Sequence, residues 1–216
     1  MNVNMSSNTN RTNLRRFYDR LSRFYGFVGV FDNHCKKKAL SYVDLHEGAR
    51  FLDAGSGDGY ALFAAGARSS DCEFFGVDFS LNMTKLASKR GILRCHVSAG
   101  DCFNLPYKSS SFDVVFSSFV LDLFDRDDRE RVARELCRVL RKSGTLVLVN
   151  NTRGRGFFWW LSSLYLMMRW VFPKAFLDMP ISASEIINEI ECLEVKENVV
   201  FGFTEIVVSR KMNNKS

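Results

Sequence analysis

Residues 51–60, FLDAGSGDGY, decide how this chain is organised. The apolar run that ends in Asp53 and Ala54 predicts a buried strand over residues 50–54, and the alternate glycines after it predict a turn into a helix near Tyr60. Glycine adopts positive φ without strain and has no Cβ to obstruct a ligand, and a helix N-terminus offers unpaired N–H groups. The stretch therefore predicts a strand, a ligand-binding turn and a helix in succession.

The same stretch indicates what kind of ligand the turn holds. A dinucleotide-binding turn has the spacing G-x-G-x-x-G, and Tyr60 stands where its last glycine would be. Asp53 precedes the first glycine, and a buried carboxylate there would repel a pyrophosphate but attract an ammonium group, directly or through water. We therefore expect a ligand that lacks phosphates and carries a positive charge.

Strands and helices alternate after this turn, which predicts the fold class. Further strands are expected over residues 72–78, 92–98, 111–119 and 145–151, and helices over 81–90 and 127–140, the second of which Gly144 would stop. Two β-rich runs, 192–200 and 203–210, predict an antiparallel hairpin. The chain is therefore predicted to be α/β, with a doubly wound, mostly parallel seven-stranded sheet closed by a C-terminal antiparallel hairpin.

Three acids, Asp53, Asp78 and Asp101, end or follow three successive strands of this predicted sheet. The carboxyl ends of parallel strands meet at one edge, and ligands of such sheets bind there. Asp78 is placed to accept hydrogen bonds from both hydroxyls of a ribose, and Asp101 to accept one from an exocyclic adenine amine. The ordered set favours a ligand site over three unrelated turn residues.

Charge and composition narrow the range of partners. The net charge is +6, but the basic residues are spread along the chain, and only Lys36, Lys37 and Lys38 form a run, which predicts a solvated face. Nucleic-acid binding is therefore not expected. The histidines do not cluster and the six cysteines lack metal-site spacing, so no metal is expected either.

The cysteines and the N-terminus indicate a compartment. Cysteines inside apolar segments are typical of reduced core thiols, which favours a reducing, cytoplasmic location. Residues 1–13 lack the apolar core of a secretory signal, so a disordered tail is expected, with a weak organellar targeting segment as the alternative.

With these residues in place, the sequence resembles the class I S-adenosylmethionine-dependent methyltransferases, which have a Rossmann-like sheet. The resemblance covers about residues 14–210, although Ser143 stands where the family often has proline. Within the family, RFYDRLSRFYGF and LPYKSSSFDVV are most similar to the ubiquinone/menaquinone-biosynthesis type of small-molecule methyltransferase. The motifs that carry the resemblance to the class are DAGSGDG, GVDFS, GDCFNLPYKSSSFDVVFSS and RVLRKSGTLVLVN.

The resemblance implies a single domain over residues 14–216, with N-terminal lid helices at about 14–47, a cofactor-binding core at about 48–152, a hydrophobic helix on the acceptor side at about 156–172 and closing strands at about 192–210. It implies S-adenosylmethionine as cofactor and S-adenosylhomocysteine as product. The acid and glycines of the first turn would border the methionine end, and the two later acids would bind ribose and adenine. The implied cofactor-binding residues are Asp53, Ala54, Gly55, Ser56, Gly57, Gly59, Asp78, Phe79, Met83, Asp101, Cys102, Phe103, Ser117 and Ser118.

The implied chemistry needs little covalent help from the protein. The sulfonium already activates its methyl group, so positioning and exclusion of water supply much of the rate, and a base is needed only for a protonated acceptor. Asp122, Tyr25, Tyr18 and His34 are the candidates for a base or an acceptor-orienting group. Asp122 follows the fourth strand, nearest the methyl group, although a carboxylate there could equally cap a helix, and packing is the alternative role for the tyrosines.

From Phe157 to Trp170 the chain is rich in Trp, Phe, Leu and Met. The run is short and carries Arg169, which disfavours a transmembrane helix. Three roles are open: the roof of a lipophilic acceptor pocket, a peripheral membrane or homodimer contact, and ordinary core.

Together these features predict transfer of a methyl group from S-adenosylmethionine to a small, lipophilic or aromatic acceptor, with C- or O-methylation favoured. A protein or peptide methyltransferase is one alternative, and a non-catalytic, S-adenosylmethionine-binding regulatory protein is another.

Overall fold

The structure is a computed structural model that describes residues 25–152, 182–190, 192–201 and 204–212. Its strands are β1 (Arg50–Ala54), β2 (Glu73–Asp78), β3 (Cys95–Ala99), β4 (Phe112–Ser118), β5 (Leu140–Asn151), β6 (Leu193–Phe201) and β7 (Thr204–Lys211). Its helices are α2 (Tyr25–Leu40), α3 (Tyr60–Gly66), α4 (Leu81–Ser88), α5 (Arg126–Val139) and α7 (Ala183–Asn188), with a short 3-10 helix, η1 (Leu121–Leu123).

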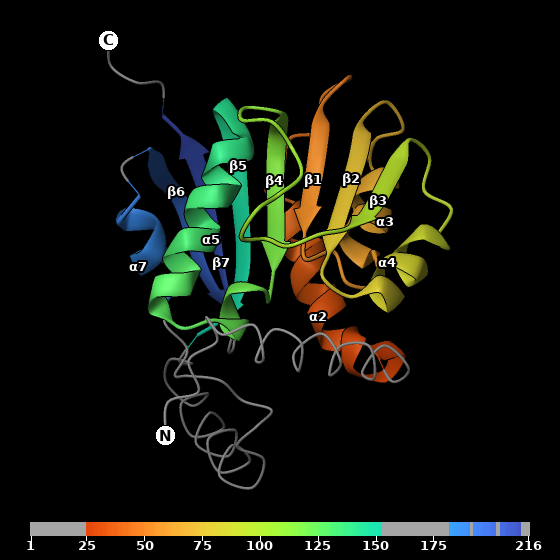
Figure 1. The fold of residues 1–216 in the computed structure, drawn as a ribbon, viewed down its shortest axis with the longest axis horizontal. Coiled ribbons are helices and arrows are strands. Elements are labelled where there is room, and N and C mark those ends of the chain that lie inside the picture. The colour runs from red at the N-terminus through yellow and green to blue at the C-terminus, as the bar shows by residue number, and fades with distance from the viewer. Residues whose placement is uncertain (1–24, 153–181, 191, 202–203, 213–216) are drawn as a thin grey trace, which may run out of the picture.

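The seven strands form one sheet in the order β3-β2-β1-β4-β5-β7-β6 (Figure 1). The strands β1 to β5 pair in parallel, and β7 pairs antiparallel with both β5 and β6. The predicted fold class is therefore confirmed, closing hairpin included. Because β1 lies between β2 and β4, the strand order reverses there, and ligands of such sheets bind at this point.

Helices cover both faces of the sheet and bury two apolar cores. On one face, Cys35, Ala39 and Leu40 of α2 pack with α3 and with Phe51 of β1. On the other, α5 and α7 pack against a second cluster that includes Leu52 of β1. Successive residues of a strand point to opposite faces of the sheet, so the side chains of β1 contribute alternately to the two cores.

Several predicted helix signals are confirmed. Ser80 caps α4, with its hydroxyl accepting a hydrogen bond from the amide of Met83 at 3.3 Å. The stripe expected on α5 is buried at Val132, Leu136 and Val139, which places that helix against the sheet.

Two strand boundaries differ from the prediction. Gly144 does not stop α5, because β5 already begins at Leu140, which pairs with Phe112 of β4. Gly144 lies inside the strand, where a Cβ would come within 2.9 Å of the Asp113 carbonyl oxygen. The strand β3 begins at Cys95 because Arg94, at φ 50°, holds the preceding turn in a left-handed conformation.

Two side-chain predictions are also corrected. Lys36 is only 4% exposed, because it lies on the face of α2 that packs on the sheet, whereas Lys37 is exposed. The sulfur atoms of Cys137 and Cys192 are in contact, so these two are not isolated core thiols; their Cα atoms are 7.6 Å apart, beyond the roughly 4.4–6.8 Å usual in disulfides.

Some predictions lie outside the residues that the structure describes. These are the tail at 1–13, the lid segment before α2, and the apolar run from Phe157 to Trp170. In the described part of the chain, no helix has the length and hydropathy that crossing a membrane requires.

Candidate functional site

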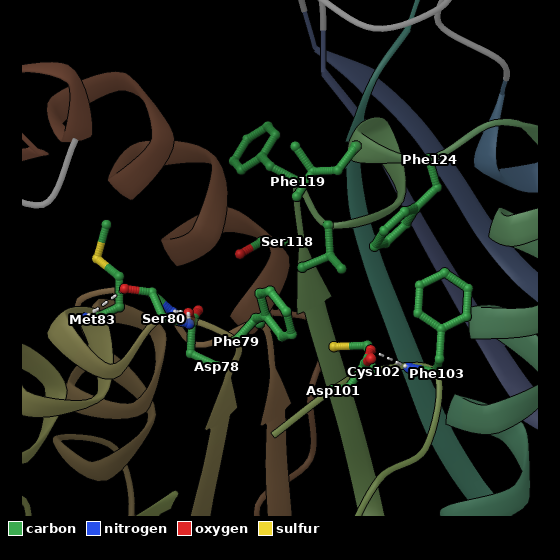
Figure 2. A pocket seen from close by; sticks show the side chains of 14 residues that line it. Asp78, Phe79, Ser80, Met83, Asp101, Cys102, Phe103, Ser118, Phe119 and Phe124 are labelled. Atoms are coloured by element: carbon green, nitrogen blue, oxygen red, sulfur yellow. Dashed lines mark hydrogen bonds between the residues drawn. The ribbon is translucent and has the colours of Figure 1, made fainter. Parts of the chain in front are cut away.

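A pocket lies where β1, β2 and β4 end, next to the reversal of strand order, and Figure 2 shows its walls. Acidic and polar residues from β2 and the loop after β3 line it together with an aromatic wall, which Phe103 forms with Phe119 and Phe124 of the β4–η1 corner. The residues that line the pocket are Gly55, Gly57, Asp78, Phe79, Ser80, Met83, Asp101, Cys102, Phe103, Ser118, Phe119, Val120, Leu123 and Phe124.

The glycine turn connects β1 to α3 with three left-handed residues, Gly55, Gly57 and Gly59, at φ 79°, 53° and 79°. A Cβ on Gly55 would collide with the side chain of Val120, and one on Gly59 would approach Cα of Ala87 within 2.9 Å. These two glycines are therefore needed for packing within the protein as well as for their backbone conformation.

Asp78 at the end of β2 fixes the turn. Its two carboxylate oxygens accept hydrogen bonds from the amides of Gly57 and Ser80, each at 2.8 Å. Phe79, next in the chain, is 36% exposed and projects into the pocket (Figure 2).

Asp101 forms the floor of the pocket together with Cys102. Its carboxylate accepts a hydrogen bond from the amide of Phe103 at 3.0 Å, which closes a tight turn. Cys102 is buried, and desolvation raises the pKa of its thiol far above the usual range. A thiol that stays protonated carries no charge. The charged group at this part of the pocket is therefore the carboxylate of Asp101.

An aromatic wall faces these acids. The rings of Phe103 and Phe124 meet edge to face, with centroids 4.9 Å apart, and Phe119 stands above Ser118 (Figure 2). Phe119 has φ 59°, a left-handed conformation that is an outlier for a bulky residue. Backbone strain of this kind is concentrated at functional sites.

Asp53 lies outside the pocket wall and is buried without a hydrogen bond from the described residues. It is 1% exposed, and neither carboxylate oxygen has a hydrogen-bond partner among the described residues. Burial raises its pKa to about 7, the positive charge of Lys36 opposes that rise, and Asp78 and Asp58 add to it. A buried acid that lacks a donor suits a ligand with an ammonium group.

The structure separates the predicted residues into those in the pocket wall and those behind it. The hydroxyl of Ser117 does not line the pocket. It donates a hydrogen bond to the Ala54 carbonyl at 2.9 Å, which connects β4 to β1. The predicted residues in the wall are Gly55, Gly57, Asp78, Phe79, Met83, Asp101, Cys102, Phe103 and Ser118. Those outside it are Asp53, Ala54, Ser56, Gly59 and Ser117.

Asp122 does not line the pocket. Its carboxylate accepts hydrogen bonds from the backbone and side-chain amides of Asn151, both at 2.9 Å. Burial raises its pKa, and these hydrogen bonds act against the rise. Of the other candidates, Tyr25 lies in α2, His34 is exposed on that helix, and Tyr18 is outside the described residues.

The sequence reasoning missed much of the apolar wall. Phe119, Val120, Leu123 and Phe124 all belong to the run SSFVLDLF, of which only the two serines and the acid were predicted as site residues. The place of this segment in the sequence could have identified these residues, because a segment that follows β4 must cross the carboxyl edge of the sheet, where ligands bind.

Part of this chain is similar to known methyltransferases. Residues 52–148 match the methyltransferase domain model. A demethylmenaquinone methyltransferase of Thermotoga maritima is 31% identical over 132 residues, which are 61% of this chain and 56% of that protein. The nocamycin O-methyltransferase of Saccharothrix syringae is 33% identical over 137 residues, 61% of this chain and 48% of that protein.

A solved structure agrees with the fold. An S-adenosylmethionine-dependent methyltransferase from Thermotoga maritima superposes with a TM-score of 0.69 at 20% identity, over 91% of this chain and 99% of that one. The chain spans about half the length of the curated relatives it matches. The matched segment contains the glycine turn, all three acids and the β4–η1 corner. Residues 52–148 of this chain are therefore similar to the methyltransferase domain, and the remaining described strands complete the sheet around that segment.

Proposed function

We propose that the chain transfers a methyl group from S-adenosylmethionine to a small lipophilic or aromatic acceptor, on carbon or oxygen. The observation that carries the proposal is one pocket with two chemically different sides. Asp78 and Asp101 lie on one side, and the phenylalanine wall lies on the other, with Ser118 between them (Figure 2). A cofactor with polar ends needs the first side, and an apolar acceptor needs the second.

The acids suit the polar groups of the cofactor. Asp78 lines the pocket at the end of β2, where its carboxylate would accept hydrogen bonds from the ribose hydroxyls. Asp101 would accept a hydrogen bond from the adenine amine, and Phe79 would pack on the adenine face. Asp53 would neutralise the ammonium of the methionine end, which would give its two oxygens the donors they lack within the described chain.

The apolar wall suits the acceptor. Val120, Leu123 and Phe124 offer no hydrogen bonds from their side chains, so an acceptor beside them gains mainly from burial of its apolar surface and from ring contacts. Two similar proteins, a demethylmenaquinone methyltransferase and a nocamycin O-methyltransferase, are named for small-molecule acceptors, which supports this proposal.

The pocket residues would contribute to methyl transfer mainly by positioning the acceptor against the cofactor. When bound, the cofactor supplies a methyl group already activated by a sulfonium. Phe119 and Phe124 would hold the acceptor against that methyl and exclude water, and orientation of this kind contributes up to about 7–11 kcal/mol in favourable cases. Asp122 is anchored to Asn151, so we assign it an anchoring role, whereas Ser118 lines the pocket with its hydroxyl group.

Methyl-labelled S-adenosylmethionine tests the proposal. The purified protein is incubated with label and a small-molecule extract, or with label and the protein fraction of the same cells. We expect label in an organic-extractable product only, which mass spectrometry then identifies. Label confined to protein would favour the protein or peptide methyltransferase, and cofactor binding without any labelled product from either fraction would favour a regulatory protein.

A further inference from the structure

Arg90 lies just beyond the end of α4, next to the outer side of the glycine turn. Its amide donates a hydrogen bond to the carbonyl of Ala87 at 3.1 Å, so the residue continues the last turn of that helix. Gly91, at φ 65°, then leads the chain away from the helix. The backbone of Arg90 is therefore fixed by α4, and only its side chain reaches the turn.

The end of α4 packs directly on the turn because Gly59 has no side chain. A Cβ at Gly59 would come within 2.9 Å of Cα of Ala87 and within 3.4 Å of Cδ of Arg90. The amide of Gly59 donates a hydrogen bond to the carbonyl of Ser56 at 2.9 Å, which closes the turn itself. The absence of a side chain therefore lets the arginine lie against the backbone of the turn.

Arg90 binds two groups of Asp58, the residue between the last two glycines. Its Nε donates a hydrogen bond to the Asp58 carbonyl oxygen at 2.6 Å, and its Nη2 forms an ion pair with the carboxylate. The same carboxylate accepts a hydrogen bond from the amide of Tyr60, the first residue of α3, at 3.3 Å. The side chains of Arg90 and Asp58 are 28% and 20% exposed, so water and salt screen this ion pair less than one on the open surface.

Two rings of α3 support the guanidinium of Arg90. Its Cζ lies 5.8 Å from the ring centre of Tyr60 and 5.9 Å from that of Phe63, within the range of cation–π contacts. The two aromatic residues are three apart, so their side chains lie on the same face of the helix. Tyr60 stands where a dinucleotide-binding turn has its last glycine, and this contact gives its side chain a structural role.

Hydrogen bonds thus hold the turn from two sides. On the inner side, the carboxylate of Asp78 accepts one from the amide of Gly57 at 2.8 Å. On the outer side, Arg90 holds Asp58, the next residue. Gly57 lines the pocket and Arg90 does not, so the arginine can affect a bound ligand only through the turn.

We propose that Arg90 is a positioning residue for cofactor binding, which through Asp58 holds the glycine turn in the conformation that S-adenosylmethionine requires. This rests on the proposed function. A turn that the protein already holds in place need not be ordered when the ligand binds, so Arg90 raises the affinity by preorganisation.

The test is calorimetric titration of the full chain with S-adenosylhomocysteine. Arg90→Met removes both contacts with Asp58 and should weaken binding by about tenfold. Arg90→Lys keeps a charge for the carboxylate but lacks the planar fork, and it should bind within about threefold of the wild type. The control is Lys89→Met, which removes the exposed neighbouring charge and should leave the affinity unchanged.

A double-mutant cycle with Asp58→Asn tests whether the arginine acts through Asp58. The asparagine keeps an oxygen for the amide of Tyr60 and removes the charge that faces Arg90. We expect Asp58→Asn to weaken binding by at least about threefold, and the double variant to bind within about twofold of Arg90→Met alone. Losses that multiply in the double variant would show that the two residues act independently, which would overturn the proposal.

Hydrogen exchange of the ligand-free protein shows where Arg90 acts. In Arg90→Met, the amides of Gly59 and Tyr60 should exchange faster than in the wild type, because their acceptors lie in the turn, whereas the amides of β5 should keep their rates. Equal acceleration in β5, unchanged affinity of Arg90→Met, or no rescue by Arg90→Lys would each overturn the proposal.

Two further outcomes are also decisive. If Arg90→Met does not fold, Asp58→Asn decides, and an unchanged affinity of that variant for S-adenosylhomocysteine would overturn the proposal. If the wild type does not bind S-adenosylhomocysteine, the proposed function is contradicted and this inference with it, whereas binding that Arg90→Met leaves unchanged contradicts the inference alone.

Discussion

Asp53 illustrates how a single residue can trade stability for binding. It is buried without a donor among the described residues, and its pKa of about 7 is above that of an unfolded aspartate. An acid with a raised pKa in the folded state costs no stability below its unfolded pKa, and the cost grows as the pH rises toward the folded pKa. The charged form that would attract an ammonium is therefore the form that destabilises the empty protein.

Asp53→Asn should therefore stabilise the ligand-free protein at high pH. The gain should increase from about pH 4 to pH 7 and then stay constant, at no more than about 4 kcal/mol, since one pKa unit is worth about 1.36 kcal/mol. Urea unfolding at pH 5 and pH 8 measures it. A variant that is less stable than the wild type at pH 8 would show that Asp53 has a partner that holds it charged.

Asp78→Ala should weaken S-adenosylhomocysteine binding and loosen the glycine turn. The change removes the acceptor of the Gly57 and Ser80 amides together with the proposed ribose contact, and we expect an affinity loss of about 10- to 100-fold. Calorimetry measures it, with the exposed Asp71→Ala as the control. Unchanged affinity in Asp78→Ala would refute the ribose assignment.

Phe119 permits a direct test of backbone strain in the pocket wall. Phe119→Ala and Phe119→Gly both delete the ring, but only glycine adopts φ 59° at no cost. We expect the glycine variant to be more stable by about 1 kcal/mol, the reverse of the usual order. Thermal unfolding of the two variants measures this difference in stability. An alanine variant that is as stable as the glycine variant, or more stable, would mean that the chain relaxes to another conformation.

At the scale of elements, the β4–η1 corner forms the apolar wall and is tied to the end of β5. The tie is Asp122, which accepts two hydrogen bonds from Asn151. The corner also contacts the glycine turn, because Val120 fills the space beside Gly55. The two sides of the pocket are thus connected through packing, so a change at the corner can reach the turn.

Asp122→Ala should destabilise the protein by about 1–3 kcal/mol, because it leaves a partly buried amide without an acceptor. Asp122→Asn keeps an acceptor oxygen and should lose less. Two measurements on these variants distinguish an anchoring role of Asp122 from a role as general base. They are the free energy of unfolding in denaturant and, once an acceptor is known, the rate of methyl transfer. Full stability combined with a large fall in kcat would contradict the anchoring role.

At the scale of the whole molecule, the sheet could be predicted from sequence because its signals are local. The apolar run before Gly55, the cap at Ser80 and the stripe on α5 each act within a few residues. The burial of Lys36 could not be predicted in this way, because it depends on which face of α2 meets a sheet formed later in the chain. Phe119 and Phe124 could be predicted only from their position, because the segment after β4 crosses the carboxyl edge of the sheet, where the acids lie.

The ligand was predictable for a related reason. Asp53, Asp78 and Asp101 are far apart in sequence, but parallel strands bring their carboxyl ends to one edge, so order along the chain predicts proximity. No comparable rule places Asp122, whose position is set by its hydrogen bonds to Asn151.

Titration of the purified chain with S-adenosylhomocysteine and, separately, with NAD tests the central claim most directly. The two ligands share an adenosine moiety, but one has an amino-acid end and the other a pyrophosphate. The buried carboxylate of Asp53 and the pocket beside the glycine turn predict stoichiometric binding of S-adenosylhomocysteine and no measurable heat with NAD. Saturable NAD binding with no response to S-adenosylhomocysteine would contradict the account.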